Sequence, residues 1–296
     1  MKYTSVNEYL KNKYGEKVYK LSIDAGMTCP NRDGTIGRGG CIFCSEGGSG
    51  DFTFGAEKPY ACTKKDIKLQ LDKAKALISS KSDCKKFIAY FQAYTNTYAP
   101  IDYLKEVFYA AIECPEIEIL SIATRCDCIS EEVLSLLREL NRIKPVWVEM
   151  GLQSMHLKTL EFIKCGYTFE DFKESTLRLD REGIEVIAHL ILGLPGETEE
   201  MMLQSLDSVL ALPIQGIKLQ LLHILKGTEL ARIYEENPFH IFSMEEYCSL
   251  VVRCLKRIPP DIVIHRLTGD GPRRLLIEPE WSTDKKRVLN TINKSI

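Results

Sequence analysis

The chain has 296 residues, of which 45% are hydrophobic and 27% are charged, and its formal net charge is −2. This composition excludes a disordered or collagen-like chain, and the length allows one large domain or two modest ones. No run of about 18 apolar residues is present, and residues 1–8 lack the apolar core of a signal peptide. We therefore expect a cytoplasmic protein with no membrane partner.

Short apolar segments alternate with segments of helical periodicity along the chain. The strand-like segments are residues 18–23, 87–91, 118–123, 146–150, 186–192, 217–222 and 262–265. The helix-like segments are residues 64–79, 101–114, 130–141, 156–164, 169–182, 199–211 and 243–257. This alternation predicts a parallel sheet covered by helices. We expect the α/β class, either as a complete or partial (β/α) barrel or as a doubly wound sheet, since both have this periodicity.

Cysteine is unusually frequent in this chain, with 11 copies. Disulfide scaffolds are typical of small exported domains, so metal or redox chemistry is the better interpretation for cysteines with ligand-like spacing. Cys29, Cys41 and Cys44 have such spacing and follow the first predicted strand, where an α/β barrel places its reactive residues. The glycines of segment 34–50 allow the backbone to approach a metal–sulfur centre closely.

The count of three cysteines distinguishes two kinds of metal centre. A structural zinc site has four closed ligands, which would require Cys62 or a histidine in addition. A [4Fe–4S] cluster held by three cysteines leaves one iron open for a substrate or cofactor. We therefore predict an iron–sulfur cluster on Cys29, Cys41 and Cys44, with a zinc site as the alternative.

A known family has the same arrangement. The Cys-x-x-Cys motif at 41–44, with a third cysteine upstream after the first strand, resembles the radical S-adenosylmethionine superfamily. Segments 20–35 and 47–52 are similar to its YhcC/YtqA-type, MnmL-like subfamily, which separates the three cysteines by eleven and two residues. The resemblance runs from about residue 9 to about residue 281.

This resemblance implies a fold, two cofactors and a partner. The fold would be a partial (β/α)6-type TIM barrel over residues 19–230, preceded by an N-terminal segment, 1–18. Residues 231–296 would form a short C-terminal extension that packs on the barrel and could contact substrate. The cofactors would be the [4Fe–4S] cluster and S-adenosylmethionine, which is cleaved reductively so that a radical takes hydrogen from the substrate. An electron donor of the flavodoxin or ferredoxin type is implied as a partner.

The resemblance also implies contacts to S-adenosylmethionine from the ends of successive strands. The residues concerned are Gln92, Tyr94, Arg125, Glu149, Gln153 and Gly193. The first two would meet the methionine amino group, and the arginine would pair with the carboxylate. The pair from the Glu-x-Gly-x-Gln-Ser motif would lie near the methionine or ribose, and the glycine beside adenine. The alternative is that these residues only cap strand ends or form turns.

The remaining cysteines have weaker interpretations. Cys126 and Cys128 end the third predicted strand, and the family usually has Thr-Arg-Pro-Asp-Cys there, so Cys126 replaces a proline. A packing role is favoured for both over a redox role. The others lack ligand spacing and are expected to be core or surface thiols, so no second cluster is predicted. They are Cys62, Cys84, Cys114, Cys165, Cys248 and Cys254.

A late polar segment, 265–274, carries the candidate substrate-binding residues. They are His265, Arg266, Asp270, Arg273 and Arg274. Guanidinium groups suit phosphate or carboxylate, and Arg273 or Arg274 could meet a substrate carboxylate; a tight turn with exposed arginines is the equal alternative. Residues 253–296 carry 10 Lys and Arg against 5 Asp and Glu, which is compatible with an anionic partner such as nucleic acid.

The MnmL-like resemblance implies a tRNA substrate. It would be wobble uridine, with 5-carboxymethylaminomethyl groups converted to 5-aminomethyl groups, and a downstream tRNA methyltransferase would act in the same pathway. Two other functions stay open: a radical enzyme acting on a small molecule or peptide, and a non-catalytic, zinc-stabilised RNA-binding protein. The sequence does not point to a residue that quenches the substrate radical.

Overall fold

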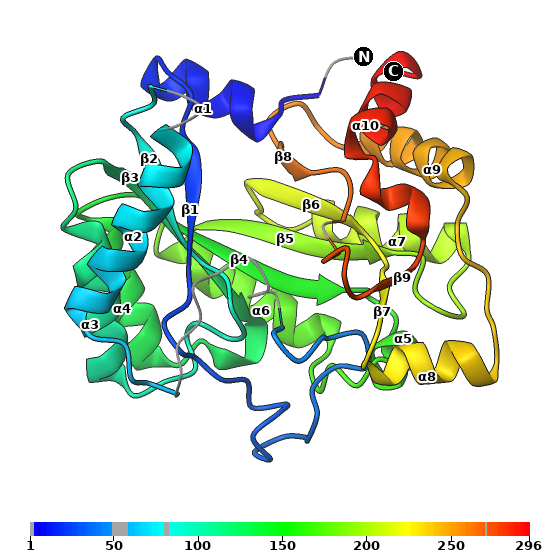
Figure 1. Ribbon diagram of the computed structural model, residues 1–296, viewed down its shortest axis with the longest axis horizontal. Helices are drawn as coiled ribbons and strands as arrows, with labels where there is room; N and C mark the ends of the chain where they lie inside the picture. The colour runs from blue at the N-terminus through cyan, green and yellow to red at the C-terminus, as the bar shows by residue number, and fades with distance from the viewer. Residues whose placement is uncertain (1–2, 49–58, 80–82, 270) are drawn as a thin grey trace.

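A computed structural model describes residues 3–48, 59–79, 83–269 and 271–296. Its main sheet has seven parallel strands in the order β1-β2-β3-β4-β5-β6-β8 and forms an open, curled barrel (Figure 1). The strands are β1 (Tyr19–Ile23), β2 (Phe87–Phe91), β3 (Ile117–Arg125), β4 (Val146–Gln153), β5 (Glu185–Leu192), β6 (Gly216–Leu221) and β8 (Val263–Arg266). The predicted α/β class and partial barrel are confirmed, and the doubly wound alternative is not what the chain adopts.

Helices cover the outer face of this sheet. They are α2 (Lys64–Ser79), α3 (Ile101–Ile112), α4 (Glu131–Asn141), α5 (Leu157–Phe162), α6 (Phe169–Arg181), α7 (Glu199–Leu210) and α9 (Met244–Arg257). Their starts are encoded locally: the Ser130 hydroxyl accepts from the Val133 amide, and Thr168 forms a capping box with Asp171. Helix α4 buries one apolar stripe, and burial of each leucine in that stripe stabilises the folded protein by about 1.5–3 kcal/mol.

A helix that the sequence analysis did not predict closes the N-terminal end of the barrel. Helix α1 (Val6–Tyr14) lies across the starts of the strands (Figure 1). It buries Leu10 in a small apolar cluster with side chains from the strand starts, which are Val18, Ile88, Ile119, Trp147 and Ile187. Ser5 also forms a bridge to Ile264 of β8. The barrel is therefore sealed with apolar side chains at one end and can hold polar groups above that seal.

The C-terminal part of the chain joins the barrel directly. Strand β8 supplies its seventh strand, and α10 (Lys285–Lys294) lies beside α9 (Figure 1). Short elements follow β6: β7 (Ile224–Leu225) pairs antiparallel with β9 (Leu276–Glu278), and α8 (Glu229–Glu236) lies between them in sequence. These short elements and α10 had no signal in the periodicity. Among the described residues, no helix has the length and apolar character needed to cross a membrane.

Candidate active site

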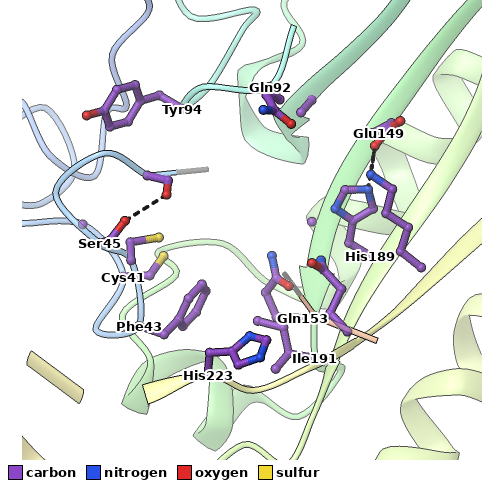
Figure 2. A pocket seen from close by; sticks show the side chains of 18 of the residues that line it. Cys41, Phe43, Ser45, Gln92, Tyr94, Glu149, Gln153, His189, Ile191 and His223 are labelled. Carbon is purple, nitrogen blue, oxygen red and sulfur yellow. Dashed lines mark hydrogen bonds and ion pairs between the residues drawn. The ribbon is translucent and has the colours of Figure 1, made fainter. Parts of the chain in front are cut away.

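One cavity of about 580 Å³ lies at the carboxyl ends of the barrel strands. Cys29, Cys41 and Cys44 border it on one side, and Glu149 and Lys218 line it deep inside the barrel. Figure 2 shows Cys41 and Phe43 of the cysteine loop across the cavity from Gln92, Glu149 and His189. We call the three cysteines the rim and the buried polar residues around Glu149 the floor. The cavity therefore joins a segment after β1 with residues from most other strands.

The cysteine loop is held by its own backbone and by one arginine. The Cys44 amide donates to the Cys41 carbonyl at 2.9 Å, which closes the Cys-x-x-Cys turn. The Arg32 guanidinium donates to the carbonyls of Cys44, at 3.3 Å, and of Ser45. Gly40 has a φ of +88°, and a Cβ there would lie 2.8 Å from Arg32 Nε, so only glycine fits. The loop thus presents its cysteines without regular secondary structure.

Polar groups surround the sulfur of Cys41. Asn31 Nδ2 donates to Cys41 Sγ at 3.5 Å, and Cys165 Sγ lies 3.9 Å away. Hydrogen bonding with Cys165 and Cys44 holds the pKa of the Cys41 thiol well below its ordinary value. Thiolates are the form that binds iron, and amide donors to ligand sulfur tune a cluster's potential. Cys165 was expected to be an ordinary thiol, and only the fold brings it to the rim.

The donor set fits an iron–sulfur cluster better than zinc completed by Cys62. The Cys62 thiol donates to the Asp24 carbonyl at 3.6 Å and is not among the cavity-lining residues. Within the described ranges, no three His, Cys, Asp or Glu side chains are grouped so that they could hold a single metal ion. Three thiols bordering an open cavity, with Asn31 donating to one of them, are the chemistry that a cluster with one free iron requires.

Most of the residues expected to contact S-adenosylmethionine line this cavity. Gln92, Arg125 and Gln153 do so, as does Tyr94, whose hydroxyl donates to the Glu46 carbonyl at 2.6 Å. The Arg125 guanidinium forms two hydrogen bonds with the Asp127 carboxylate, at 2.9 and 2.7 Å. It thus reaches the cavity already paired. A cofactor carboxylate would have to share it with that aspartate.

Gln153 has the strongest local signs of a binding role. Its φ is +72°, a conformation that costs a non-glycine residue about 1–3 kcal/mol, and it stands at a register shift in β4. Its Oε1 is buried and has no hydrogen-bond partner among the described residues. A Cβ on Gly151 would lie 2.3 Å from Gln153 Nε2, so that glycine makes room for the amide. An unfilled acceptor beside the cavity suits a hydroxyl or ammonium donor.

Glu149 is fully buried and accepts hydrogen bonds from four side chains. Lys20 Nζ lies 2.6 Å and Ser121 Oγ 2.7 Å from its Oε1. His189 Nε2 lies 3.2 Å from its Oε2, which also pairs with Lys218 Nζ. Burial alone would raise the pKa of Glu149, but the charges of Lys20 and Lys218 hold it well below its ordinary value. The carboxylate is therefore ionised, and each of its two oxygens already has two hydrogen-bonding partners.

Burial also shifts the pKa values of the side chains that contact Glu149. Desolvation lowers the pKa of Lys218 to about 7, although Glu149 opposes the shift. It also lowers the pKa of His189 to about 4, so this histidine is neutral at pH 7. The Lys218 ammonium makes a second contact, with Tyr90 Oη at 3.2 Å. The charge on the floor near neutral pH thus depends on one lysine.

The candidate substrate-binding residues of the late polar segment, 265–274, do not all lie at the cavity. Arg266 lines the cavity, whereas His265 is partly buried and packs against the Trp147 ring, with 5.0 Å between ring centroids. Arg273 donates to the Thr283 carbonyl at 3.0 Å, and neither it nor Arg274 is among the cavity-lining residues. Asp270 lies outside the described residues, as do residues 49–52 of the 47–52 segment.

Gly193, expected beside adenine, also lies away from the cavity lining. Its φ is +93°, and a Cβ would lie 3.2 Å from the Phe242 ring. Ile191, two residues earlier in β5, does line the cavity. Sequence reasoning missed the floor lysines, Lys20 and Lys218. The signal was a single lysine within an apolar segment on β1 and another on β6, because a charged side chain inside a covered strand needs a buried partner.

Comparison with known families agrees with this geometry. A model of the Radical SAM superfamily matches residues 32–209, and a model of the Radical_SAM C-terminal domain matches residues 214–296. The chain belongs to the radical SAM superfamily. It is 41% identical to the Bacillus subtilis (strain 168) protein YtqA over 295 residues, covering 100% of this chain and 89% of YtqA. It is 36% identical to the Escherichia coli (strain K12) protein YhcC over 277 residues, covering 93% and 86%. The predicted YhcC/YtqA-type subfamily is thus confirmed.

Two more distant similarities are also present. The chain is 26% identical over 162 residues to the tRNA uridine(34) acetyltransferase of Methanocaldococcus jannaschii, covering 54% of this chain and 29% of that one. The structure of Methanocaldococcus infernus Elp3 superposes with a TM-score of 0.67 at 18% identity, covering 94% of this chain and 63% of that longer chain. The chain thus has the same fold as that structure. As a member of the radical SAM superfamily, the enzyme uses a [4Fe–4S] cluster and S-adenosylmethionine as cofactors.

Proposed function

We propose that this enzyme removes the carboxymethyl group from 5-carboxymethylaminomethyluridine at the wobble position of tRNA and leaves 5-aminomethyluridine. The observation that carries the proposal is a cavity bordered by the three cysteines and lined, at its far end, by the cationic side chains of Lys218 and Arg266. Such a cavity suits a small group that bears a carboxylate. The similarity to an enzyme named for tRNA uridine 34 supports the choice of nucleotide.

The size of the cavity is compatible with a single nucleoside. A volume of about 580 Å³ is far too small for folded RNA. Enzymes that modify a base take it out of the stack and into a pocket, and an anticodon loop presents unpaired bases. The basic residues of 253–296 would then contact phosphates outside the cavity.

The reaction balances with the cofactors that the family uses. With cluster and S-adenosylmethionine bound, the pair supplies a 5′-deoxyadenosyl radical that accepts one hydrogen atom. The arm loses that atom from the CH2 between its nitrogen and carboxylate, and loses one electron to a one-electron acceptor of the iron–sulfur class. Water adds to the resulting C=N bond, and cleavage of the C–N bond releases glyoxylate and the primary amine. The apolar seal below the floor, including Leu10 and Trp147, keeps bulk water from the other side.

Analysis of tRNA nucleosides tests the proposal. Cells that lack the protein should accumulate the carboxymethylaminomethyl nucleoside and lose the aminomethyl form and its methylated derivative. Wild-type protein should reverse both changes, and a Cys44→Ala variant should not. Identical nucleosides with and without the protein would contradict the proposal and would favour a small molecule or peptide as the substrate.

Two partners belong to the same proposal. The reductive cleavage needs a one-electron donor, for which a flavodoxin or a ferredoxin is suitable. The aminomethyl product would be the substrate of a downstream tRNA methyltransferase. Purified enzyme with each reduced donor in turn should release glyoxylate from tRNA of the deletion strain, and absence of glyoxylate with every donor would argue against this route.

A further inference from the structure

The floor of the cavity carries more positive than negative charge. Lys20 of β1 and Lys218 of β6 both pair with Glu149, and Arg266 of β8 is the register partner of Lys218. Among the described residues that line the cavity, Glu149 is the one carboxylate, and it already accepts from both lysines. His189 is neutral at pH 7. Two lysines on the described floor therefore share one carboxylate, and the side chains of Lys218 and Glu149 are buried.

An uncompensated buried cation is unfavourable. The Lys218 side chain is 5% exposed, and Arg266 acts on it as a second positive charge from the neighbouring strand. An ammonium has three donors, and the contacts of Lys218 with described residues, to Glu149 and Tyr90, use two of them. An anionic ligand in the cavity would offset the excess charge and accept the third donor.

We propose that Lys218 and Arg266 bind the substrate's carboxylate at the cavity floor, and that Glu149 holds Lys218 in position. This inference rests on the proposed function, because that function supplies a substrate with a carboxylate on a short arm. It assigns substrate recognition to β6 and β8 rather than to Arg273 and Arg274, which do not line the cavity.

The same floor would favour release of the product. The substrate arm bears a carboxylate beside its amine, whereas the product arm keeps only a primary ammonium. Once the carboxylate has left as glyoxylate, that ammonium lies near Lys218 and Arg266, and like charges repel. Carboxylate recognition and product release thus follow from one arrangement of charge.

A pair of anticodon stem-loops isolates the charge of the arm. One carries the carboxymethylaminomethyl arm on uridine 34, and the other carries its carboxamide, which has the same shape and no negative charge. Dissociation constants are measured anaerobically with cluster-loaded protein and S-adenosylmethionine, without reductant, so that no turnover occurs. The ratio of the two constants reports recognition of the carboxylate and cancels the general affinity for RNA.

Wild-type protein should prefer the carboxylate stem-loop by about 30-fold, as expected for a buried charge pair. Lys218→Met should abolish the preference, and Arg266→Gln, at a partly exposed position, should reduce it about fivefold. Arg232→Gln, on the surface of α8, is the matched control and should keep the wild-type ratio. A wild-type ratio in both floor variants would overturn the inference.

Two further measurements keep the outcomes distinct. Thermal unfolding shows whether Lys218→Met folds, and Arg266→Gln carries the test if it does not. Turnover with reductant then tests the proposed function separately. Conversion without discrimination between the stem-loops contradicts only the floor assignment. Discrimination without conversion contradicts only the proposed reaction, and absence of both contradicts the two together.

Discussion

The rim and the floor of the cavity are built in opposite ways. The rim draws its three cysteines from one short loop, Cys29 to Cys44, whose backbone and Arg32 hold it in place. The floor draws Lys20, Glu149 and Lys218 from three strands far apart in the sequence, and each is held by the others. The rim carries chemistry common to the whole superfamily. The floor is where this enzyme can select its own substrate, and variants of the two regions should fail in different ways.

Loss of a rim ligand should have the largest effect. Cys44→Ala removes a cluster ligand, so iron and sulfide content after anaerobic reconstitution should fall to background and activity should be lost. Elemental analysis and the visible absorbance of the cluster measure this. Cys165→Ala is the control: its sulfur lies 3.9 Å from Cys41 Sγ but outside the three-cysteine motif, so it should keep its iron. Equal loss of iron in the control would indicate a closed, four-thiol site.

Neutralising the centre of the floor should cost stability and leave the cluster intact. Glu149→Gln leaves the buried Lys218 and the half-buried Lys20 without a counter-charge, which should lower the free energy of unfolding by about 3–5 kcal/mol. Chemical denaturation measures the change, and iron content should match wild type. The surface pair of Glu170 and Lys173 provides the control, since Glu170→Gln should cost less than about 1 kcal/mol. A stable Glu149→Gln protein would show that the floor is not a coupled ionic network.

The floor should also respond to pH. Lys218 titrates near pH 7 when folded and near 10.5 when unfolded, so between these values the unfolded chain binds more protons. Burial of the charged Lys218 therefore destabilises the folded protein most below pH 7. This destabilisation is relieved as the pH rises from 7 toward 10.5, so the free energy of unfolding increases over that range. The groups facing it from neighbouring strands are Lys20, Tyr90, Glu149, His189 and Arg266.

Carboxylate preference should move in the opposite direction to the free energy of unfolding. The preference for the carboxylate stem-loop should fall by up to about tenfold per pH unit, because Lys218 in the ligand-free protein loses its proton above pH 7. His189, with a pKa of about 4, and Tyr90, with a pKa raised well above 10, do not titrate in this window. The stem-loop ratio measured from pH 6 to 9 checks this. A slope that persists in Lys218→Met would assign the effect to another group.

The smallest effect is expected at Gln153, the proposed cofactor contact at the end of β4. Gln153→Leu removes a buried acceptor, so S-adenosylmethionine should bind about fivefold more weakly, the usual value of one hydrogen bond. Gln153→Glu keeps an acceptor and should bind more tightly than the leucine variant. Calorimetric titration without reductant measures both. Unchanged affinity in Gln153→Leu would remove this residue from the cofactor site.

The contrast between the two regions also explains what could be predicted from the sequence. Alternating apolar segments predicted the strands and the partial barrel because each strand is covered locally by the helix that follows it. The three cysteines were predicted because their spacing is local. The partnership of Lys20 with Glu149 was not, because it needs the register of several strands. Helix α1 was missed because its apolar face is narrow: of the residues in Val6–Tyr14, Leu10 alone is buried.

The central claim is that one cavity places a cluster at its rim and a substrate carboxylate on its floor. An anaerobic crystal structure with cluster, S-adenosylmethionine and the carboxymethylaminomethyl stem-loop tests it most directly. We predict cysteine sulfurs on three irons, with Cys165 unbound, and the arm's carboxylate within hydrogen-bonding distance of Lys218 Nζ. A cluster held by four cysteines, or a carboxylate bound at Arg273 or Arg274, would contradict the account.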